Sequence, residues 1–408
     1  MSQPALPRHR HCMVVHNYYP VGEPRVQRQT EALVSNGSAV DIICLRHPDE
    51  PAVEINGPIR IFRLPVYRDK KRGLAGQLLE YLAFFTLAFF KLSQLYFLHR
   101  YQVIQIHNLP DFLVFTAILP RLMGTPVILD IHDLMPEFYA SRFKSDLNSW
   151  PVRLIRLQEW LSCRFANRVI TVSELWRQTL IQRGVSPTKC FVVMNVADDN
   201  IFKRTQPSLR QNNSFHLLYH GTLTYRYGID LALRALAQVR SEVPNIELTI
   251  HGRGEYLSAL EKLVDELDLQ DNVHFSTSLI SIKELPNLLL SADVGLVPYR
   301  RDIFTDGILP TKLMEYAALG LPAIVARTPV IETYFNSDMV EFFEAGNVEA
   351  LSRCILRLKH DSARRMTIAQ NIGSFNYQHN WVNQRANYLA QIAMLTSKEM
   401  LKKSVVTE

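Results

Sequence analysis

The chain has 408 residues, more than one hydrophobic core usually organises, which indicates two domains of about 200 residues each. Apolar residues make up 47% and charged residues 21%, as in a soluble globular protein, and this composition excludes a disordered or fibrous chain. The first 200 residues carry 23 Lys and Arg against 17 Asp and Glu, whereas the remainder carries 22 of each, so the net charge of +6 lies in the first half. This basic half indicates an anionic partner, either a membrane or a phosphorylated acceptor; a solvated basic surface is the alternative interpretation.

The cysteines and the N-terminus indicate where the protein works. The 5 cysteines lie far apart, with no CxxC pair, which favours reduced thiols over a disulfide framework or a zinc site. The first residues lack the long apolar stretch of a signal peptide. We therefore expect the protein to be made and kept in the cytoplasm.

In the first half, short apolar runs alternate with helical segments, a pattern typical of parallel βα units. The expected strands are Cys12–His16, Val40–Leu45, Ile59–Leu64, Val103–His107, Val127–Ile131, Arg168–Val172 and Phe191–Met194. The expected helices between them include Arg25–Ser35, Pro110–Met123 and Val152–Ala166.

The apolar segment Leu78–Leu98 has the length of a membrane span, but Glu80 and Lys91 lie within it, and charges near the centre of a bilayer are costly. Apolar residues occur all round this segment, which favours a helix packed in the first domain. The basic residues that precede it leave a second interpretation open, an interfacial helix on anionic lipid at the inner face of the plasma membrane. These residues are Arg68, Lys70, Lys71 and Arg72.

The polar stretch Lys203–Ser214 has no periodicity and is the expected linker. The βα pattern then starts again. The expected elements are strand Phe215–His220, helix Ile229–Val243, strand Ile246–His251, helix Glu255–Leu267, strand Val273–Ser276, helix Ile282–Ser291, strand Val294–Pro298, helix Pro310–Leu319 and strand Ala323–Ala326. The sequence thus predicts an α/β protein with two tandem Rossmann-like domains that face a central cleft, 1–202 and 203–376, followed by a C-terminal helix at 377–396 that crosses back to the first domain. Ligands of such sheets bind beyond the carboxyl ends of the strands.

In the first domain, polar residues follow the expected strands. Gly22 lies where the first strand turns into a helix whose N-terminus can face an anion, although by itself this feature favours a tight turn without a ligand. His132 and Asp133 follow the strand Val127–Ile131, and His107 ends the strand before it. These residues lack metalloprotease spacing, so we expect a polar substrate pocket rather than a metal site. A satisfied core histidine is the alternative for His107.

In the second domain, glycines follow the first two strands. Gly221 opens a loop that carries the cation Arg226, which suits a phosphate, and Gly252 and Gly254 allow the backbone to approach a ligand. Each signal is weak alone, because glycine-rich turns are common in this architecture.

The strongest signal is the segment LPTKLMEYAALGLP at 309–322. Pro310 suits the first helical turn, and the free N–H groups of that turn, together with Lys312, form a cradle for a diphosphate. Glu315 lies one turn further on and can accept hydrogen bonds from a sugar diol. An ion pair between these two side chains on the helix surface is the alternative.

In this order, these segments resemble the family 4 glycosyltransferases, retaining enzymes of the GT-B fold. The resemblance covers nearly the whole chain. The segments that carry it are YYPVGEPRVQRQTEALVSNGSAVDIICL, VITVSE, VVMNVADDNIF, YHGTLTYRYGIDLALRAL, LTIHGRGE, ADVGLVPY, LPTKLMEYAALGLPAI and WVNQRANYLAQI.

The resemblance implies roles for the residues that match the family's motifs. Glu315 would bind the nucleotide ribose, Arg226, Lys312 and Thr311 the donor diphosphate, and His132, with Asp133 beside it, would lie at the reacting carbon. The family's first motif glutamate falls on Gly307, so Asp306 beside it would substitute in holding the sugar. The usual arginine and lysine after Gly221 fall on Thr222 and Tyr227, so Arg226 and Lys312 would carry the diphosphate charge, as in a subgroup with PxKxxEY. The remaining cleft residues would be Gly22, His107, Asn195, Gly221, Gly252 and Gly254.

By this resemblance, the protein is a metal-independent, hexosyltransferase-like enzyme without a cofactor. It would move a sugar from a nucleotide-diphosphate donor to a hydroxyl of a glycan or lipid-linked acceptor in exopolysaccharide or cell-envelope synthesis. Glycosidase-like paired carboxylates do not stand out, which speaks against hydrolysis. An epimerase of the same fold and a GT-B shell without catalysis remain as alternatives. Nucleic-acid binding is not expected, because the basic residues form no aromatic-interleaved patch.

Overall fold

The computed structural model describes residues 9–69, 73–204 and 214–406. The chain forms two compact units: the first contains Met1–Met194 and Gln384–Glu408, and the second contains Asn195–Asn383. The sequence placed these divisions at 202/203 and 376/377. Most of the expected linker, residues 205–213, lies outside the described residues.

The first unit is built on an eight-stranded sheet in the order β3-β4-β2-β1-β5-β6-β7-β8. Its strands are β1 His9–Tyr18, β2 Ser38–Leu45, β3 Val53–Asn56, β4 Ile59–Leu64, β5 Val103–His107, β6 Val127–Ile131, β7 Arg168–Thr171 and β8 Cys190–Val192. All pairs are parallel except β3 with β4. The sequence missed β3, because this short edge strand is mostly exposed and lacks an apolar run.

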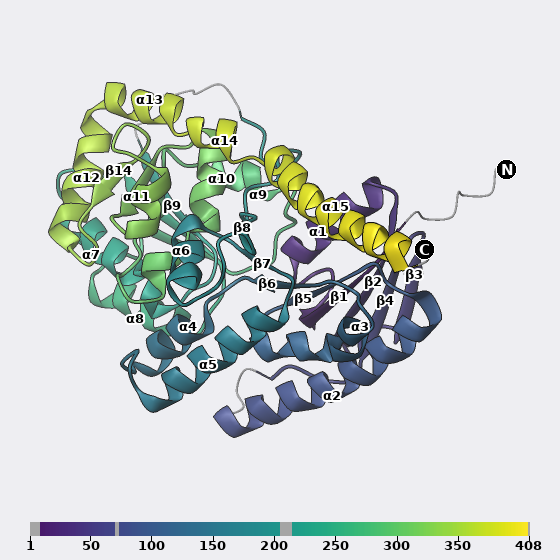
Figure 1. The fold of residues 1–408 in the computed structure, drawn as a ribbon. Helices are drawn as coiled ribbons and strands as arrows, with labels where there is room; N and C mark the ends of the chain where they lie inside the picture. Colours follow the sequence, from purple (N-terminus) through teal and green to yellow (C-terminus); the bar gives the residue numbers. More distant parts are fainter. Residues whose placement is uncertain (1–8, 70–72, 205–213, 407–408) are drawn as a thin grey trace. The chain divides into compact units, whose positions relative to one another are not determined.

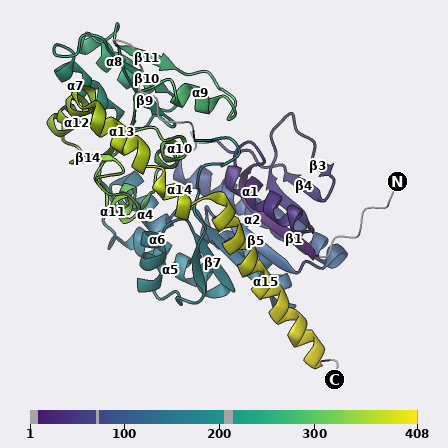
Figure 2. The same ribbon diagram turned by 90° about the horizontal axis from the view of Figure 1, so that it is seen from above.

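Helices cover both faces of this sheet. They are α1 Pro24–Ser35, α2 Leu74–His99, the 3₁₀ helix η1 Asp111–Ala117, α3 Ile118–Leu122, α4 Met135–Phe143, α5 Trp150–Phe165, α6 Glu174–Gln182 and, from Gln384 on, α15 Trp381–Val406. α1 and α15 lie on one face and α2, α3 and α5 on the other (Figure 1). Viewed from above, α15 runs across the sheet (Figure 2), and Tyr388 of this helix donates a 2.7 Å hydrogen bond to Gln105 on β5.

Two of the sequence expectations change in this unit. The expected single helix Pro110–Met123 is a 3₁₀ segment followed by the short α3. α4 begins directly after the polar cluster at the end of β6, where the sequence indicated only a pocket. The prediction of a buried parallel sheet with helical crossovers is otherwise confirmed.

The second unit contains a six-stranded parallel sheet in the order β11-β10-β9-β12-β13-β14. Its strands are β9 Phe215–His220, β10 Ile246–His251, β11 Val273–Ser276, β12 Val294–Val297, β13 Ala323–Ala326 and β14 Glu341–Phe343. Its helices are η2 Tyr225–Tyr227, α7 Ile229–Val239, α8 Leu257–Glu266, α9 Leu285–Leu289, η3 Thr305–Gly307, α10 Thr311–Leu319, α11 Pro329–Tyr334, α12 Val348–His360, α13 Ser362–Asn371 and α14 Ser374–Gln378. β12 and β13 are fully buried, as their apolar sequences VGLV and AIVA predict.

Each sheet has a switch point, where the strands that come next in the chain are added on the other side of the sheet's first strand. In the first sheet this point lies between β1 and β5, and in the second between β9 and β12. Loops leave the carboxyl ends of neighbouring strands there in opposite directions and open a crevice, which is where ligands of such folds bind. The functional residues should therefore follow these strands.

Candidate functional site

Lys312 in the first turn of α10 is the most unusual residue of the second unit. It is only 5% exposed, and its Nζ donates a 2.9 Å hydrogen bond to the hydroxyl of Tyr299. The same Nζ lies 4.8 Å, 5.0 Å and 4.8 Å from the ring centroids of Tyr219, Tyr227 and Tyr299. Burial lowers the pKa of Lys312 to about 7, and the nearby charge of Glu315 opposes this shift.

The tyrosine cage around Lys312 comes from separate segments of the chain. Tyr219 lies on β9, Tyr227 on η2 and Tyr299 just after β12, so the switch point of the sheet brings them together. The rings of Tyr227 and Tyr299 stack at 4.4 Å with an interplanar angle of 17°. Ring faces attract an ammonium but do not neutralise it, so the site retains a buried cation that an anion can pair with.

Glu315 is held by His220 at the end of β9. The imidazole Nε2 lies 2.5 Å from a carboxylate oxygen of Glu315, and its Nδ1 lies 3.0 Å from the hydroxyl of Tyr316. The Tyr316 ring has room because Gly295 on β12 carries no side chain: a Cβ there would lie 2.6 Å from the ring. Glu315 therefore accepts a hydrogen bond from His220 at the end of β9. The alternative interpretation, a surface ion pair between Glu315 and Lys312, is not the contact that holds Glu315.

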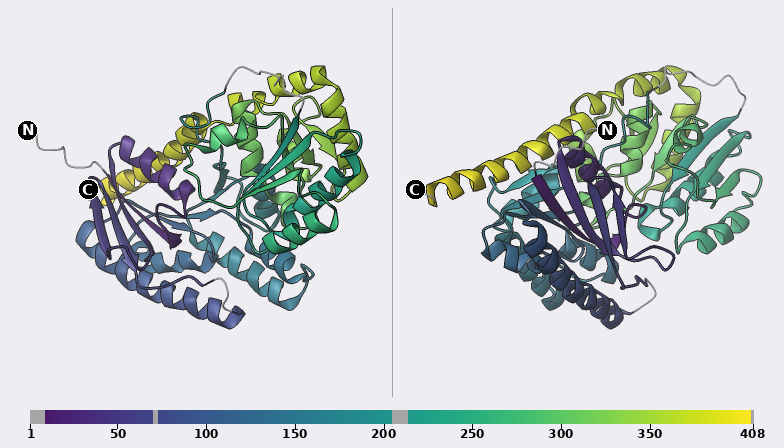
Figure 3. Two further views of the ribbon diagram at one scale, coloured as in Figure 1. Left: turned by 180° about the vertical axis from the view of Figure 1, so that it is seen from behind. Right: turned by 90° about the vertical axis from the view of Figure 1, so that its right-hand side faces the viewer.

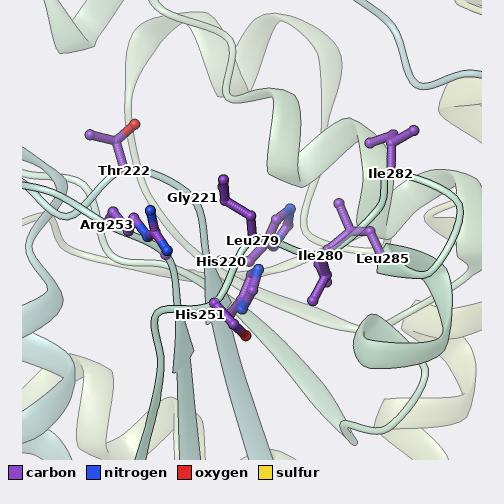
Figure 4. Close-up of a pocket in the computed structure, with 11 residues that line it drawn as sticks. His220, Gly221, Thr222, His251, Arg253, Leu279, Ile280, Ile282 and Leu285 are labelled. Atoms are coloured by element: carbon purple, nitrogen blue, oxygen red, sulfur yellow. The ribbon is translucent and has the colours of Figure 1, made fainter. Parts of the chain in front are cut away.

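A cavity of about 370 Å³ opens beside these groups. Figure 4 shows His220, Gly221 and His251 at the strand ends and an apolar wall of Leu279, Ile280, Ile282 and Leu285 facing them. Arg253 and Thr222 lie at its other side. A cavity with an apolar wall and a few polar groups on its floor is suited to a flat, partly polar ring.

The glycines of the two loops serve the packing of the loops on each other. A Cβ on Gly252 would lie 1.9 Å from the carbonyl oxygen of Gly221, and one on Gly254 would lie 1.9 Å from that of Leu223. Gly221 itself has φ +114, and its ideal Cβ position lies 3.5 Å from Nζ of Lys312. The close backbone approach that the sequence assigned to a ligand at Gly252 and Gly254 is thus made by the loop after β9, and Gly221 brings this loop to the ammonium.

The remaining predicted residues of this unit surround α10. Thr311 begins the helix and is exposed, and Pro310 is the capping residue before it. Arg226 on η2 lies over the Phe304 ring at 5.3 Å. Asp306 pairs with Arg301 at 2.7 Å, a partner that the sequence did not indicate, and Gly307 beside it is buried.

In the first unit, Asp130 on β6 is the centre of a buried polar network. Arg25 of α1 donates to both of its carboxylate oxygens at 2.8 Å and 3.0 Å, and Gln29 donates to one at 2.9 Å. Burial alone would raise the pKa of Asp130, but Arg25 and His132 hold it well below its usual range. The sequence missed Arg25 and Asp130 as a pair, because 105 residues separate them along the chain.

His107 and His132 lie at the crevice end of this network. Nδ1 of His107 is 3.1 Å from Nε2 of His132 and 3.4 Å from Asp130. His132 is partly exposed, and its Nδ1 lies 3.9 Å from Glu23. The side chain of Asn108 accepts from the His132 backbone N–H at 2.7 Å and donates to the backbone oxygen of Asp133 at 2.7 Å. The buried groups thus hold His132 at the strand end with one ring nitrogen directed away from the network.

Three of these residues, His107, Asp130 and His132, have possible ligand atoms within 4.8 Å of one another, close enough for a metal ion. Asp130 is already bound by the Arg25 guanidinium, whose charge would oppose a second cation at the same carboxylate. The donor set therefore fits a hydrogen-bonded network better than a metal site.

The two other predicted residues lie at loops. Gly22 makes a tight turn after β1, where a Cβ would lie 2.7 Å from the backbone oxygen of Tyr18, and Asn17 donates to its carbonyl at 3.2 Å. Asn195 is half-buried at the first position of the second unit. Gly22 is thus explained by the turn itself.

Comparison with known proteins places the chain in a family. Residues 22–195 match the model of the glycosyl transferase 4-like domain, and residues 201–374 match that of glycosyl transferases group 1. An uncharacterized glycosyltransferase of Methanocaldococcus jannaschii is 26% identical over 72% of this chain and 74% of its own length. One component of the human phosphatidylinositol N-acetylglucosaminyltransferase is 22% identical over 86% of this chain and 69% of its own.

Solved structures share the fold at low identity. Sucrose-phosphate synthase from Thermosynechococcus elongatus superposes with a TM-score of 0.78 at 19% identity, over 96% of this chain and all of its own. Anabaena HepE in complex with UDP-glucose has a TM-score of 0.70 at 18% identity, over 95% of this chain and 100% of its own. The predicted pair of Rossmann-like domains is confirmed, and the chain belongs to the family 4-type glycosyltransferases of the GT-B fold.

Proposed function

We propose that this glycosyltransferase moves a sugar from a nucleotide-diphosphate donor to a hydroxyl of a glycan or lipid-linked acceptor, with retention of the anomeric configuration. The observation that carries the proposal is the buried ammonium of Lys312, which lies among tyrosine rings near the Glu315 charge. Keeping a lysine in such a place costs stability, so it needs a ligand that restores its charge. A diphosphate at the N-terminus of α10 supplies that charge and also accepts from the free N–H groups of the first turn.

Different groups around Lys312 would bind different parts of the nucleotide. The cavity between His251 and the Leu279 wall would take the base, and Glu315 would accept hydrogen bonds from the ribose diol. HepE, which shares the fold, has been solved with UDP and with UDP-glucose. We therefore take a nucleoside diphosphate sugar as the donor class, with UDP as the first nucleotide to test.

The reaction would need neither metal nor cofactor. The bond between the anomeric carbon and the diphosphate oxygen breaks, and negative charge grows on that oxygen. The fixed charge of Lys312 and the dipoles of the α10 N–H groups would stabilise this growing negative charge. The acceptor oxygen attacks from the face that the leaving group departs from, and its proton passes to the departing phosphate oxygen. His132 and Asp133 would line the acceptor side.

The acceptor class is proposed from the relatives and from the basic first half. Curated relatives include the phosphatidylinositol N-acetylglucosaminyltransferase component of Homo sapiens and the chitobiosyldiphosphodolichol beta-mannosyltransferase of Candida albicans, whose names contain lipid groups. An acceptor with a lipid or phosphorylated lipid carrier fits this pattern. Exopolysaccharide or cell-envelope glycan synthesis at the inner face of the plasma membrane is the setting we propose.

One observation favours a second candidate, a shell that binds a nucleotide without transfer. Gly307 stands where the family carries its first motif glutamate, and Asp306 beside it is engaged by Arg301. If Asp306 holds the donor sugar, Asp306→Ala should lower transfer strongly and leave UDP binding unchanged, because UDP has no sugar. Wild-type protein that binds UDP-sugars but neither transfers, hydrolyses nor epimerises them would favour the shell.

The test of the proposed function is donor binding by thermal shift and calorimetry with a panel of nucleotide sugars. Wild-type protein should gain stability with at least one donor, as ligand linkage requires. Lys312→Met should abolish the gain, whereas the control Lys262→Met, at an exposed position of α8, should keep it. Absence of binding by every nucleotide sugar would contradict the proposal. An epimer formed from a UDP-sugar without acceptor would identify an epimerase instead.

A further inference from the structure

The first unit exposes a large apolar surface formed by α2, α3 and α5 on one face of its sheet. We define this surface by its exposed apolar residues. On α2 they are Leu78, Leu79, Leu82, Leu87, Phe90, Phe97 and Leu98; on and after α3, Ile118, Leu122 and Met123; on α5, Trp150, Leu154, Leu157, Trp160 and Leu161. Scattered apolar residues are normal on a protein surface, but a contiguous set of this size marks an interaction site.

The phase of α2 shows that this helix lies along a surface rather than through a membrane. Ala75–His99 is long and apolar enough to span a bilayer, and only 28% of its most apolar window is buried. However, Phe84, Ala88 and Leu92 are completely buried against the unit, one turn apart from each other. A spanning helix would need lipid all round, whereas α2 has one face on protein and the opposite face free. Figure 3 shows α2, in blue, lying beneath the strands of the first sheet in both views.

The acidic residues of these helices face inward. Glu80 of α2 is 5% exposed and pairs with His16 at 3.2 Å, and Glu159 of α5 is 2% exposed and pairs with Arg183 at 3.0 Å. In the described residues of α2, α3 and α5 every Asp and Glu is therefore buried. The exposed face of α5 carries Arg153 and Arg164 instead. The exposed charged residues of α5 are thus basic.

Aromatic contacts join the helices into one surface. Phe85 of α2 packs against Phe112 of η1 at 5.9 Å, and Phe115 of η1 packs against Phe165 of α5 at 5.1 Å. η1 therefore lies between α2 and α5 and fixes both on the same face of the sheet. At 1.5 Å per residue, α2 extends for about 39 Å, so the surface is long.

We propose that this α2–α3–α5 surface docks in the plane of an anionic lipid bilayer. Leucine and phenylalanine side chains would enter the acyl boundary, and Trp150 and Trp160 would lie at the headgroup level, which tryptophan prefers. Arg153 and Arg164 would pair with lipid phosphates. Docking of this kind would bring the proposed transferase to a lipid-linked acceptor, but the docking itself does not depend on donor chemistry.

The experiment is co-sedimentation of the full chain with vesicles of phosphatidylcholine alone and of phosphatidylcholine mixed with phosphatidylglycerol. Wild-type protein should bind the mixed vesicles, and salt should weaken this binding. Phe90→Gln with Phe97→Gln on α2, and Leu157→Gln with Leu161→Gln on α5, should each weaken binding by about tenfold or more. The control pair is Val53→Gln with Ile55→Gln, because β3 of the same unit is also exposed and apolar. This control should bind like the wild type.

Tryptophan fluorescence gives an independent readout. The chain has 4 tryptophans, and Trp176 is buried, whereas Trp150 is 74% exposed. Mixed vesicles should shift the emission to shorter wavelength, and Trp150→Phe with Trp160→Phe should lose most of this shift while the protein still sediments with the vesicles.

Three results would overturn the proposal. The first is wild-type protein that does not bind mixed vesicles, and the second is helix variants that bind like the wild type. The third is self-association without lipid that the helix variants abolish. This third result would identify a second copy of the chain as the occupant of the surface. Thermal melting of each variant excludes misfolding as a cause. Thermal shift with nucleotide sugars separates a failure of docking from a failure of the donor site, because the helix variants leave the second unit intact.

Discussion

The carboxylate of Glu315 lies 2.5 Å from the imidazole of His220. Nδ1 of this histidine lies 3.0 Å from the Tyr316 hydroxyl, which in turn lies 3.3 Å from the backbone oxygen of Leu218. Glu315 is therefore held in one rotamer by the protein's own side chains. Such preorganisation lowers the entropy that nucleotide binding costs.

Glu315→Gln should weaken UDP binding by about 10- to 100-fold, because hydrogen bonds to a charged acceptor contribute about 1.5–3 kcal/mol. The measurement is calorimetry with UDP and with a 2′,3′-dideoxy analogue. The variant and the wild type should bind the analogue equally. His220→Ala should weaken UDP binding less than Glu315→Gln, since it removes only the residue that positions the carboxylate. Equal losses with both ligands would contradict a ribose role for Glu315.

Lys312→Met should stabilise the unliganded protein. The folded pKa of Lys312 is about 7, against 10.5 for an unperturbed lysine, so the unfolded state binds this proton more tightly than the folded state. Lys312 therefore lowers the free energy of unfolding by the full amount below pH 7, and this loss of stability disappears as the pH rises toward 10.5. Methionine fills a similar volume among the tyrosine rings without a charge. We expect a higher melting temperature at pH 7 together with loss of donor binding; a lower melting temperature would show that the ammonium is already compensated.

Donor affinity should fall as the pH rises above 7. A bound diphosphate requires Lys312 in its protonated form, so binding above the free pKa must take up a proton. The dissociation constant of a nucleotide sugar, which has no ionisation of its own in this range, should rise by about tenfold per pH unit above pH 7 until the pKa of the bound state. His251 lines the same cavity, but burial and then the charge of His220 lower its pKa, so it stays neutral in this range. Calorimetry at pH 8 in buffers of different ionisation enthalpy should show uptake of about one proton per donor bound. A dissociation constant that does not change between pH 6.5 and pH 8.5 would contradict this role.

The positions of Gly221 and His132 were predictable because each follows a buried apolar strand, and parallel strands bring their carboxyl ends together. Lys312 was predictable because Pro310 marks the start of its helix, whose first N–H groups can face an anion. The tyrosine cage was not. Tyr219 and Tyr299 stand within or beside apolar strands, where an aromatic residue is usually core, and nothing along the chain links them to Lys312. The role of Gly295 could not be predicted either, because this glycine makes room for the ring of Tyr316 on another element.

The exposed face of α2 also could not be predicted from sequence. A helix that is apolar all round has no hydrophobic phase, so periodicity does not indicate which side is buried. The inward direction of Glu80, toward His16 on β1, fixes the phase and appears only in the folded structure. The sequence therefore predicted the helix but not the surface that it forms with α5.

The buried His11 on β1 should make the protein sensitive to acid. Burial, and then the charge of His107, lower the pKa of His11 from 6.5 to about 3, against a hydrogen bond with Gln105 that raises it. Between these two values the unfolded chain binds a proton that the folded protein does not, so stability is lost as the pH falls from 6.5 toward 3. This residue should contribute about 1.4 kcal/mol per pH unit to the slope. His11→Gln should flatten the dependence of the unfolding free energy on pH by that amount, and the control His274→Gln, at an exposed position of β11, should leave it unchanged. Urea unfolding at several pH values between 4 and 7 measures both slopes, and identical slopes for the wild type and His11→Gln would show that His11 is protonated inside the fold.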